Sequence, residues 1–578
     1  MLFFFSVSSR MPKTTFIVHK KWVLLWACFF SVGWLLPNHV APWVSFHTDA
    51  WFAVASAIAA APLLIRTKGP WAAPASGVLL GVVSCIPLLQ WACGLIPVGG
   101  IAEMSLAYLV GFCLVVLCGA RWEALAPDVV LDGLFAALGL AAVLSVWLQL
   151  MQWFEMDTGW EWWSMGGSGN RPSANFGQPN QAATFLCLGL GAVAWGAWRQ
   201  QIRWGVGLLA AAYLLFGIAL TGSRTAWLGL GLVVLSVWHW RHLWPDGRTP
   251  WRISALYGYL AACAGFLLWL APKDSLLTAV STKSAGIRQN IWHLCWEAIC
   301  AAPWTGYGWN QTALAEVRAL DMRSDGFIPF NAAHNLFIDV VVWCGIPLGG
   351  VLCIAIVVWL VKRFLVVKRP DQAVLMLLVL LVFNHAMLEL PLHYAYLLLP
   401  VGWLIGALEA RTAGNVDRWV KVPRAAVVAL SLSATTLLAL IIRDYFPIEE
   451  AYQNMQYERS RIQIAAWTVP DALVLSHFSR QVGLMRAATP KGLSEAELVE
   501  REQLIEALPD GHAIFYLAVA EALNQRPEQA VVWLRRYCKM SAVDGCVNAE
   551  KNWSHLGTSH PEIAAIPWPF PLVKGVQP

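Results

Sequence analysis

Charged residues are scarce in this sequence of 578 residues: only 13% are Asp, Glu, Lys or Arg, while 58% are apolar. A soluble domain of ordinary composition has about 25% charged residues and about 45–50% apolar ones. Apolar runs of about 17–25 residues recur, and each is long enough to cross a hydrocarbon core of about 30 Å. The composition therefore excludes a soluble globular protein and predicts an all-α polytopic membrane protein that resides in a lipid bilayer.

Metal-binding spacings are also missing. The 13 cysteines fall mostly within apolar runs, where cysteine behaves as a small hydrophobic residue, and no Cys-x-x-Cys or Cys/His spacing indicates a metal site. The net charge of +5 comes mostly from loops and indicates no nucleic-acid partner. Cys538 and Cys546 lie close together in a polar tail, where they either form a disulfide, if the tail is extracytoplasmic, or stay free.

No small-residue cleavage site follows the apolar start, so we expect an uncleaved first span and no signal peptide. Hydropathy predicts about 13 transmembrane helices. Their expected positions are residues 22–36, 50–66, 75–93, 104–120, 129–150, 180–198, 204–220, 224–240, 254–271, 336–361, 373–389, 393–410 and 424–442.

Lys and Arg are nearly absent from one set of loops. If the N-terminus is cytoplasmic, the cytoplasmic segments hold 20 Lys and Arg, and the short outer loops hold two, Arg171 and Arg224. Positive residues of short loops accumulate on the cytoplasmic side. The asymmetry predicts a multi-pass protein of the inner membrane of a Gram-negative cell, with the N-terminus cytoplasmic and the C-terminus periplasmic.

Two long polar segments interrupt the apolar pattern, and both face the periplasm in this topology. Residues 272–335 form one large mixed-charge loop, the expected catalytic loop of a transmembrane domain that covers residues 1–442. Residues 443–578 contain no membrane-length apolar run and have helical periodicity. They predict a small α-helical C-terminal periplasmic domain for binding or docking. Residues 494–497, with the sequence Ser-Glu-Ala-Glu, predict a capping box at the start of one of its helices.

Arg171 and Arg224 lie in short loops that the topology places in the periplasm, although positive residues of short loops favour the cytoplasmic side. Their presence there needs an explanation. The structural alternative is that each arginine extends its head to water at the membrane surface. Arg224 closes a tight outer turn, Thr221-Gly222-Ser223-Arg224. Arg171 opens a polar stretch whose Gly, Pro and Asn residues favour a fixed turn backbone. Constrained backbones of this kind favour a binding role for both arginines.

Four other polar residues have two interpretations that the sequence leaves open. Glu297 and Asp321, in the large loop, are either acid/base residues or ordinary surface carboxylates. Glu389 and His393 flank an outer turn at Pro391 and either line a site or anchor the loop.

Three stretches resemble the O-antigen ligase-like superfamily of bacterial membrane glycosyltransferases. They are the turn at residues 221–224, Arg288 on a predicted helix of the large loop, and the run from His334-Asn335-Leu336-Phe337 to Gly349. The stretch at residues 171–180, RPSANFGQPN, is similar to that of the protein O-oligosaccharyltransferase branch, the PglL or pilin-glycosylase type. The span count, the position of the loop and the extra C-terminal domain also fit that branch.

The resemblance implies an enzyme that moves a glycan en bloc from an undecaprenyl-diphosphate carrier to a Ser/Thr hydroxyl of a periplasmic or pilin-type protein. It implies no metal and no cofactor, and the predicted outer loops indeed lack an Asp-x-Asp pair. Guanidinium groups bind phosphate bidentately and can stabilise leaving-group charge in place of Mg²⁺. The implied catalytic residues are His334, Arg288 and Arg224. The implied substrate-binding residues are Arg171, Asn175, Gln178, Asn180 and Asn335.

Several alternatives remain at this stage. His334 either holds or deprotonates the acceptor hydroxyl, or only caps the span that begins beside it. A ligase to lipid A core and an O-antigen polymerase share the same scaffold and differ in acceptor; the stretch at 171–180 and the tail favour the protein transferase. A transporter for the lipid-linked glycan would favour ionisable residues near span midpoints, and the spans have almost none.

Overall fold

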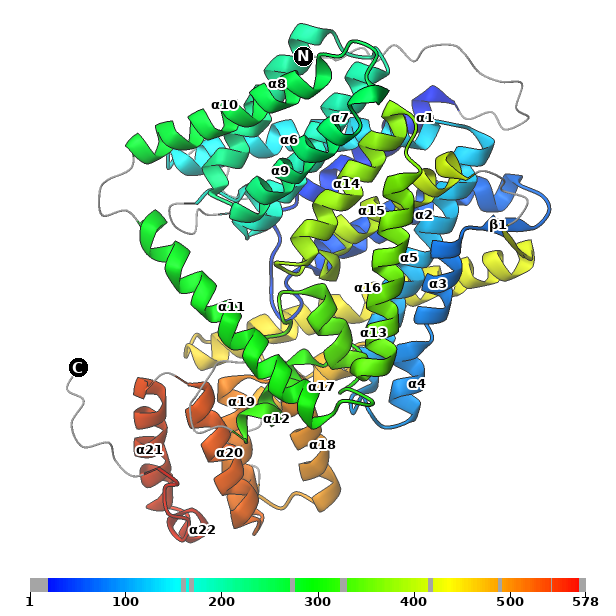
Figure 1. The fold of residues 1–578 in the computed structure, drawn as a ribbon. Helices are drawn as coiled ribbons and strands as arrows, with labels where there is room; N and C mark the ends of the chain where they lie inside the picture. The colour runs from blue at the N-terminus through cyan, green and yellow to red at the C-terminus, as the bar shows by residue number, and fades with distance from the viewer. Residues whose placement is uncertain are drawn as a thin grey trace. The chain divides into compact units, whose positions relative to one another are not determined.

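The computed structural model describes residues 19–156, 163–165, 171–270, 276–322, 330–413, 419–486, 491–541 and 543–570 (Figure 1). Parts of the predicted catalytic loop, residues 272–275 and 323–329, lie outside the described residues. The chain divides into two compact units. Unit 1 comprises residues 1–84, 107–284 and 355–439, and unit 2 comprises residues 85–106, 285–354 and 440–578. Most of the large loop and the C-terminal tail therefore belong to the same unit.

The described elements are almost all helical, as the composition predicts. In chain order the α-helices are α1 (Lys20–Val32), α2 (Phe46–Arg66), α3 (Ala75–Val83), α4 (Ile86–Ala92), α5 (Gly99–Leu125), α6 (Val129–Trp153), α7 (Pro179–Trp198), α8 (Trp204–Thr221), α9 (Arg224–His239), α10 (Thr249–Leu270), α11 (Leu276–Ala301), α12 (Thr312–Leu320), α13 (Leu336–Leu365), α14 (Pro370–Ala386), α15 (Ala395–Thr412), α16 (Arg424–Arg459), α17 (Ser476–Arg486), α18 (Glu495–Ala507), α19 (Gly511–Leu523), α20 (Pro527–Met540), α21 (Val543–Gly557) and α22 (Pro561–Ala564). Short 3₁₀ helices are η1 (Gly33–Leu35), η3 (Ala174–Phe176), η4 (Arg241–Leu243) and η5 (Pro391–His393). The one described sheet pairs β1 (Trp71–Ala73) antiparallel with β2 (Val420–Val422), with Trp71 opposite Val422.

Each of the 13 predicted spans coincides with a described helix. Among the described residues, nine helices are long and apolar enough to cross a membrane, counting α3 and α4 together; the others in this set are α2, α5, α6, α7, α8, α10, α13 and α16. The remaining four, α1, α9, α14 and α15, have 13, 16, 17 and 18 residues. A polytopic all-α fold is confirmed, and the count of 13 spans stays a prediction.

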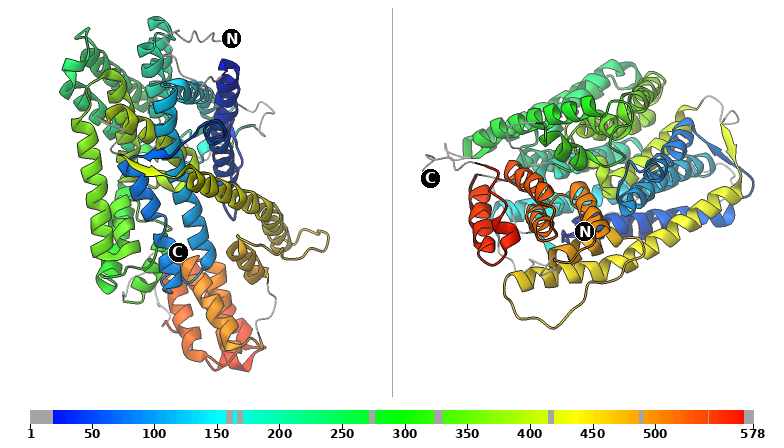
Figure 2. Two further views of the ribbon diagram at one scale, coloured as in Figure 1. Left: turned by 90° about the vertical axis from the view of Figure 1, so that its right-hand side faces the viewer. Right: turned by 90° about the horizontal axis from the view of Figure 1, so that it is seen from below.

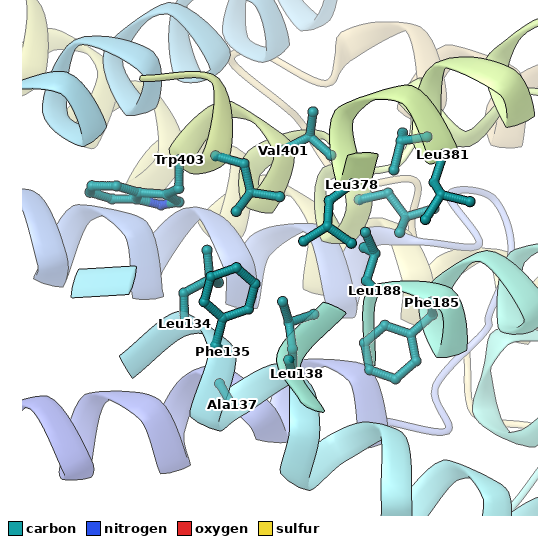
Figure 3. Close-up of a cluster of buried hydrophobic side chains, with 14 of the residues drawn as sticks. Leu134, Phe135, Ala137, Leu138, Phe185, Leu188, Leu378, Leu381, Val401 and Trp403 are labelled. Carbon is teal, nitrogen blue, oxygen red and sulfur yellow. The ribbon is translucent and has the colours of Figure 1, made fainter. Parts of the chain in front are cut away.

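The core of unit 1 is a layer of apolar side chains between α6, α7, α14 and α15. Figure 3 shows part of it, with Leu134 and Leu138 of α6, Phe185 of α7, Leu378 of α14 and Trp403 of α15. Glycines let some of these helices approach closely. A Cβ on Gly406 of α15 would lie 2.2 Å from the carbonyl oxygen of Val116 on α5. Helices in a membrane associate through such small residues, because lipid tails supply no hydrophobic drive between them.

Two predicted spans are interrupted, because residues 75–93 are divided into α3 and α4 and residues 336–361 contain a break. The sequence predicts an uninterrupted span at residues 336–361, but α13 breaks at Gly345, whose φ and ψ are 72° and 173°. The predicted end of the transmembrane domain at residue 442 also falls inside a helix, because α16 continues to Arg459. Hydropathy locates apolar residues and does not by itself show where a helix bends or where the next polar segment extends it.

The tail of unit 2 is helical as predicted. Ser494 and Glu497 form the expected capping box at the start of α18, with Glu497 accepting a 2.8 Å bond from the Ser494 amide. Helices α19 and α20 lie side by side in all three views of Figures 1 and 2, and their buried face includes Ile514 and Trp533. Cys538 and Cys546 form a disulfide between α20 and α21.

Candidate functional site

The stretch at residues 171–180, in unit 1, is a loop that contains η3 and leads into the first turn of α7, and side chains of α6 hold it. The Gln152 side-chain oxygen accepts from the amides of Ser173 (3.1 Å) and Ala174 (2.9 Å), and its nitrogen donates to the Ala174 carbonyl at 2.8 Å. Ala174 and Gly177 both have positive φ, at 52° and 67°. A non-glycine residue in this conformation is uncommon and is kept by its surroundings. The loop backbone is therefore fixed, as its turn-forming residues predict.

Asn175 lies at the centre of this loop and is only 2% exposed. Its amide nitrogen donates to the carbonyls of Leu35 (2.7 Å) and Trp163 (2.8 Å), and its oxygen accepts from the amide of Met165 at 3.0 Å. These bonds give Asn175 a role in shaping the loop. Its predicted contact with a substrate stays an untested prediction.

Arg171 joins this loop to the turn at residues 221–224. Its Nε donates to the Thr221 carbonyl at 2.7 Å, and the guanidinium is partly buried. Gly222 takes a positive φ of 57° in the turn, and Ser223 caps α9 by accepting from the amide of Ala226. Arg224 is the first residue of α9 and is exposed. The two arginines predicted from the topology are therefore neighbours in one unit.

Glu389 completes this cluster of charges. Its carboxylate accepts from Asn180 at 2.9 Å and from Gln178 at 3.3 Å. Burial lowers the pKa of Arg171, the positive charge of Arg224 lowers it further, and the negative charge of Glu389 opposes both. Glu389 is thus an anchor of the loop and also lies within electrostatic reach of Arg171. We name Arg171, Gln178, Asn180, Arg224 and Glu389 the arginine cluster.

His334 lies in unit 2, in the segment that leads into α13. The helix cap is Asn335, whose side-chain oxygen accepts from the amides of Phe337 (3.0 Å) and Ile338 (3.2 Å). Asn335, expected to bind substrate, therefore has a structural role at the least, and the roles considered for His334 stay predictions. His334 is partly buried, has a positive φ of 54°, and packs edge-on against Phe330 with ring centroids 5.8 Å apart.

A buried network of hydrogen bonds fixes the backbone before His334. Asp339, which is 3% exposed, accepts from the amide of Ala333 at 2.8 Å and from the Thr312 hydroxyl at 2.7 Å. The Thr312 oxygen in turn accepts from the indole nitrogen of Trp343 at 2.8 Å. Buried polar networks in which the members satisfy one another specify a single local arrangement. This network ties the N-terminal part of α13 to α12 and to the residue next to His334.

Glu316 holds the same segment from α12. It is fully buried and accepts from the amide of Phe330 at 2.7 Å, and burial raises the pKa of its carboxyl to about 8. Sequence reasoning missed Glu316, Thr312 and Asp339. Asp339 carried a signal, since it is a carboxylate inside an apolar run, and such residues are costly unless they serve a purpose. Glu316 carried none, because one carboxylate on a short amphipathic helix looks like a surface residue.

Arg288 lies on α11 and is partly buried. One helical turn later on the same face, the Trp292 indole donates to the Ala333 carbonyl at 2.9 Å. The structure thus brings Arg288, His334 and Asn335 into one region of unit 2. The two loop carboxylates with open interpretations have partners: Glu297 Oε1 lies 3.2 Å from His293 Nδ1, and Asp321 forms an ion pair with Arg536 at 2.7 Å. Ordinary carboxylate roles are therefore favoured for both.

The backbone groups of α13 around its break form hydrogen bonds with the segment that follows α11. The amides of Tyr307 and Gly308 donate to the carbonyls of Val342 (2.9 Å) and Trp343 (3.0 Å), and the Ile346 amide donates to the Pro303 carbonyl at 2.7 Å. Backbone groups freed at a helix break need such partners wherever water is excluded. Residues 303–308 thus supply backbone partners on both sides of the break.

Metal ligands are not clustered in the part of the chain that the structure describes. No three His, Cys, Asp or Glu side chains among those residues are grouped so that they could hold a metal ion. A metal-independent reaction stays a prediction. The candidate site residues named above offer guanidinium groups, the imidazole of His334, neutral amides and the carboxylate of Glu389.

Comparisons with known proteins agree with the resemblance of the sequence motifs. Residues 209–353 match the family described as O-antigen ligase, and residues 373–542 match the family described as virulence factor membrane-bound polymerase, C-terminal. A general O-oligosaccharyltransferase of Acinetobacter baylyi is 31% identical over 541 residues, which cover 89% of this chain and 92% of that protein. This chain belongs to the O-oligosaccharyltransferase family. The family prediction made from residues 171–180, Arg224, Arg288 and His334 is thereby confirmed.

A second member of this family, a ComP-specific O-oligosaccharyltransferase of the same species, is 28% identical over 247 residues. The alignment covers 42% of this chain and 45% of that protein. The O-antigen ligase match spans Arg224, Arg288 and His334. The polymerase match continues from α14 through the first 100 residues of the tail, to residue 542.

Proposed function

We propose that this membrane protein is a glycosyltransferase that moves an oligosaccharide en bloc from an undecaprenyl-diphosphate carrier to a Ser/Thr hydroxyl of a periplasmic or pilin-type protein. The observation that carries the proposal is the similarity, over 89% of the chain, to a general O-oligosaccharyltransferase. Because this similarity extends over the tail as well as the spans, it favours a protein acceptor over lipid A core.

The arginine cluster is the proposed site for the diphosphate of the carrier. Burial is the main cause of the lowered pKa of Arg171, and the positive charge of Arg224 adds to it; a bound anion would offset that repulsion. Arg224 also begins α9, where the helix dipole favours negative charge. Gln178, at the N-cap of α7, and Asn180, in its first turn, are held by Glu389 and would contact the head group. Guanidinium groups keep their charge at any working pH and present a fork that matches phosphate oxygens.

His334 is the proposed acceptor-side residue. The acceptor hydroxyl oxygen attacks the anomeric carbon, and the bond from that carbon to the phosphate oxygen breaks. The hydroxyl proton passes to an imidazole nitrogen of His334, and the carrier diphosphate leaves with the bonding electron pair. Arg288 would stabilise the negative charge that develops on the phosphate. General-base assistance typically contributes about 10²–10⁴-fold.

The proposed topology has the N-terminus in the cytoplasm and the tail in the periplasm. The 20-to-2 distribution of Lys and Arg supports it. The disulfide between Cys538 and Cys546 also supports it, since disulfides persist in oxidising compartments. A periplasm-specific reporter fused after Pro578 should be active, and activity of a cytoplasm-specific reporter at that junction would contradict the topology.

The function is tested by reconstitution. Purified protein in vesicles receives lipid-linked oligosaccharide together with either a pilin-type protein or lipid A core, and the glycosylated product is identified by mass spectrometry. Transfer to protein is expected. Transfer to lipid A core alone would make the protein a ligase, and release of lipid-linked glycan across the vesicle without transfer would make it a transporter.

Variants of the proposed residues are tested in the same assay. His334→Ala should lose most transfer and still bind the carrier, whereas His334→Gln keeps part of it if the residue only holds the hydroxyl. Arg224→Ala and Arg288→Ala should abolish transfer, and lysine at either position should recover little. Arg203→Ala is the matched control, because Arg203 is an exposed arginine next to α8 and outside the arginine cluster.

A further inference from the structure

Helix α20 of the tail contacts the end of α12 through two basic side chains. Arg536 donates to Asp321 from Nε (3.1 Å) and from Nη2 (2.7 Å), and to Glu506 from Nη1 at 2.9 Å. Lys539 donates to the carbonyl of Leu320 at 2.7 Å, where α12 ends. A cation at a helix C-terminus satisfies carbonyls that have no partner within the helix. We name these bonds the α20–α12 contact.

The α20–α12 contact is more than a surface ion pair. Arg536 is only 8% exposed, and its guanidinium lies over the Trp533 ring, 4.6 Å from the centroid. Arg318 of α12 also binds Glu506, at 2.8 Å, so that two arginines and two carboxylates form one network. Exposed ion pairs contribute little to the stability of the folded protein. Removing one partner of a buried arginine that makes several bonds destabilises the protein strongly, because the remaining charge stays buried without that partner.

The N-terminal half of α12 holds the segment that contains His334. Thr312 and Glu316 are one helical turn apart and face the same side of α12. Glu316 accepts from the Phe330 amide, and Thr312 donates to Asp339, which accepts from the amide that precedes His334. Helix α12 has nine residues and is therefore a rigid element about 14 Å long. A shift of its C-terminal end would move both of these bonds.

We infer that Arg536 is a positioning residue for the transfer reaction: it holds α12 in place, and α12 holds the segment of His334. The inference rests on the proposed role of His334. It gives the tail a part in turnover in addition to docking. A tail that only docks the acceptor would change the KM for that protein, whereas a tail that positions His334 changes kcat.

The first experiment compares two neighbouring arginines of α20. Arg536→Met keeps an apolar stem over Trp533 and removes the fork, and Arg535→Met is the control, since Arg535 is exposed. Arg536→Met should lower kcat by about tenfold or more, because misplacement of a reacting group by about 1 Å can cost about 10²-fold. The KM values of carrier and acceptor should stay within about twofold of wild type in this comparison. Arg536→Lys should recover part of kcat.

The second experiment observes the segment directly and uses no activity. Hydrogen–deuterium exchange of the full-length protein follows peptides that contain the amides of Phe330 and Ala333, which Glu316 and Asp339 protect. Arg536→Met should speed their exchange, and Arg535→Met should not. If Arg536→Met fails to fold, Asp321→Asn weakens the same bond from the other side.

The outcomes separate the inference from the proposed function. Full turnover of folded Arg536→Met, a loss in KM alone, or unchanged exchange at the two amides would each overturn the role of Arg536. Arg536→Met and Asp321→Asn remove the same bond, so their losses in kcat should not add fully in the double variant. Full additivity would also overturn the role of Arg536. If His334→Ala retains transfer while Arg536→Met speeds exchange and lowers kcat, the positioning role stands and the role of His334 fails.

Discussion

Replacing Gly345 by alanine tests the break in α13. With φ at 72° and ψ at 173°, Gly345 lies in a backbone region that is essentially restricted to glycine. A Cβ at this position would lie 2.5 Å from the Trp304 carbonyl oxygen and 2.8 Å from the Thr305 nitrogen. Both contacts are to backbone atoms, which cannot rotate away. Alanine therefore forces either the break or the segment of Trp304 to move.

The magnitude follows from two terms. The backbone conformation costs a non-glycine residue about 1–3 kcal/mol. Displacing the neighbouring segment weakens the bond from the Ile346 amide to the Pro303 carbonyl, and a buried group without its partner costs about 1–3 kcal/mol. Gly345→Ala should therefore lower the free energy of unfolding by about 2–6 kcal/mol, the sum of those two ranges.

Gly350 supplies a matched control on the same helix. A Cβ there meets nothing within 4 Å, and the position is helical. Gly350→Ala should be neutral or stabilise the protein by about 0.5–1 kcal/mol, because glycine in a helix carries an entropic cost. Thermal unfolding of both variants in the same detergent measures the difference, with transfer to an acceptor protein as a second readout. Equal melting temperatures for Gly345→Ala and Gly350→Ala would refute the reasoning.

Three further predictions use single contacts. Glu389→Ala removes the acceptor for two amides of the arginine cluster and should raise the KM for the lipid-linked donor more than it lowers kcat, as steady-state kinetics will measure. Cys538→Ser opens the disulfide to Cys546 and should destabilise the tail by about 2–4 kcal/mol, seen as faster limited proteolysis there. Burial raises the pKa of Glu316 from 4.5 to about 8, so the native state holds its proton more tightly; the resulting stability is present below pH 4.5 and is lost as pH rises through about 8. Glu316→Gln should reduce the change in the free energy of unfolding between pH 4.5 and about pH 8, as denaturation at a series of pH values will measure. An unchanged pH dependence would contradict the raised pKa of Glu316.

The elements could be predicted from the sequence because apolar length and helical periodicity are local properties. Every predicted span has a helix, and the capping box at Ser494 forms as expected. The break at Gly345 could not be predicted in the same way. It depends on the backbone of residues 303–308, which donates to and accepts from α13 across more than 30 residues of chain. Only tertiary structure shows such pairing.

The candidate site divides along the same line. Arg171 and Arg224 were found because their charge contradicts the orientation bias, a property of sequence alone. The capping role of Asn335 was missed, although asparagine is a strongly preferred N-cap residue. The burial of the Glu316 carboxylate could not be predicted, because it is created by α11 and by the segment of Phe330, and neither lies beside it in the sequence.

The strained backbone of His334 leads to a final prediction. Its positive φ of 54° costs a residue with a Cβ about 1–2 kcal/mol, and Asn335 and Asp339 carry the cap and the backbone bond on either side. Asn335 and Asp339 thus make the hydrogen bonds that a capping histidine would make. His334→Gly should therefore leave the unfolding temperature unchanged or raised, while transfer falls to the level of His334→Ala. If the glycine variant is instead destabilised, the imidazole packing against Phe330 contributes more to the fold than the strained backbone costs, and a purely chemical role for His334 is wrong.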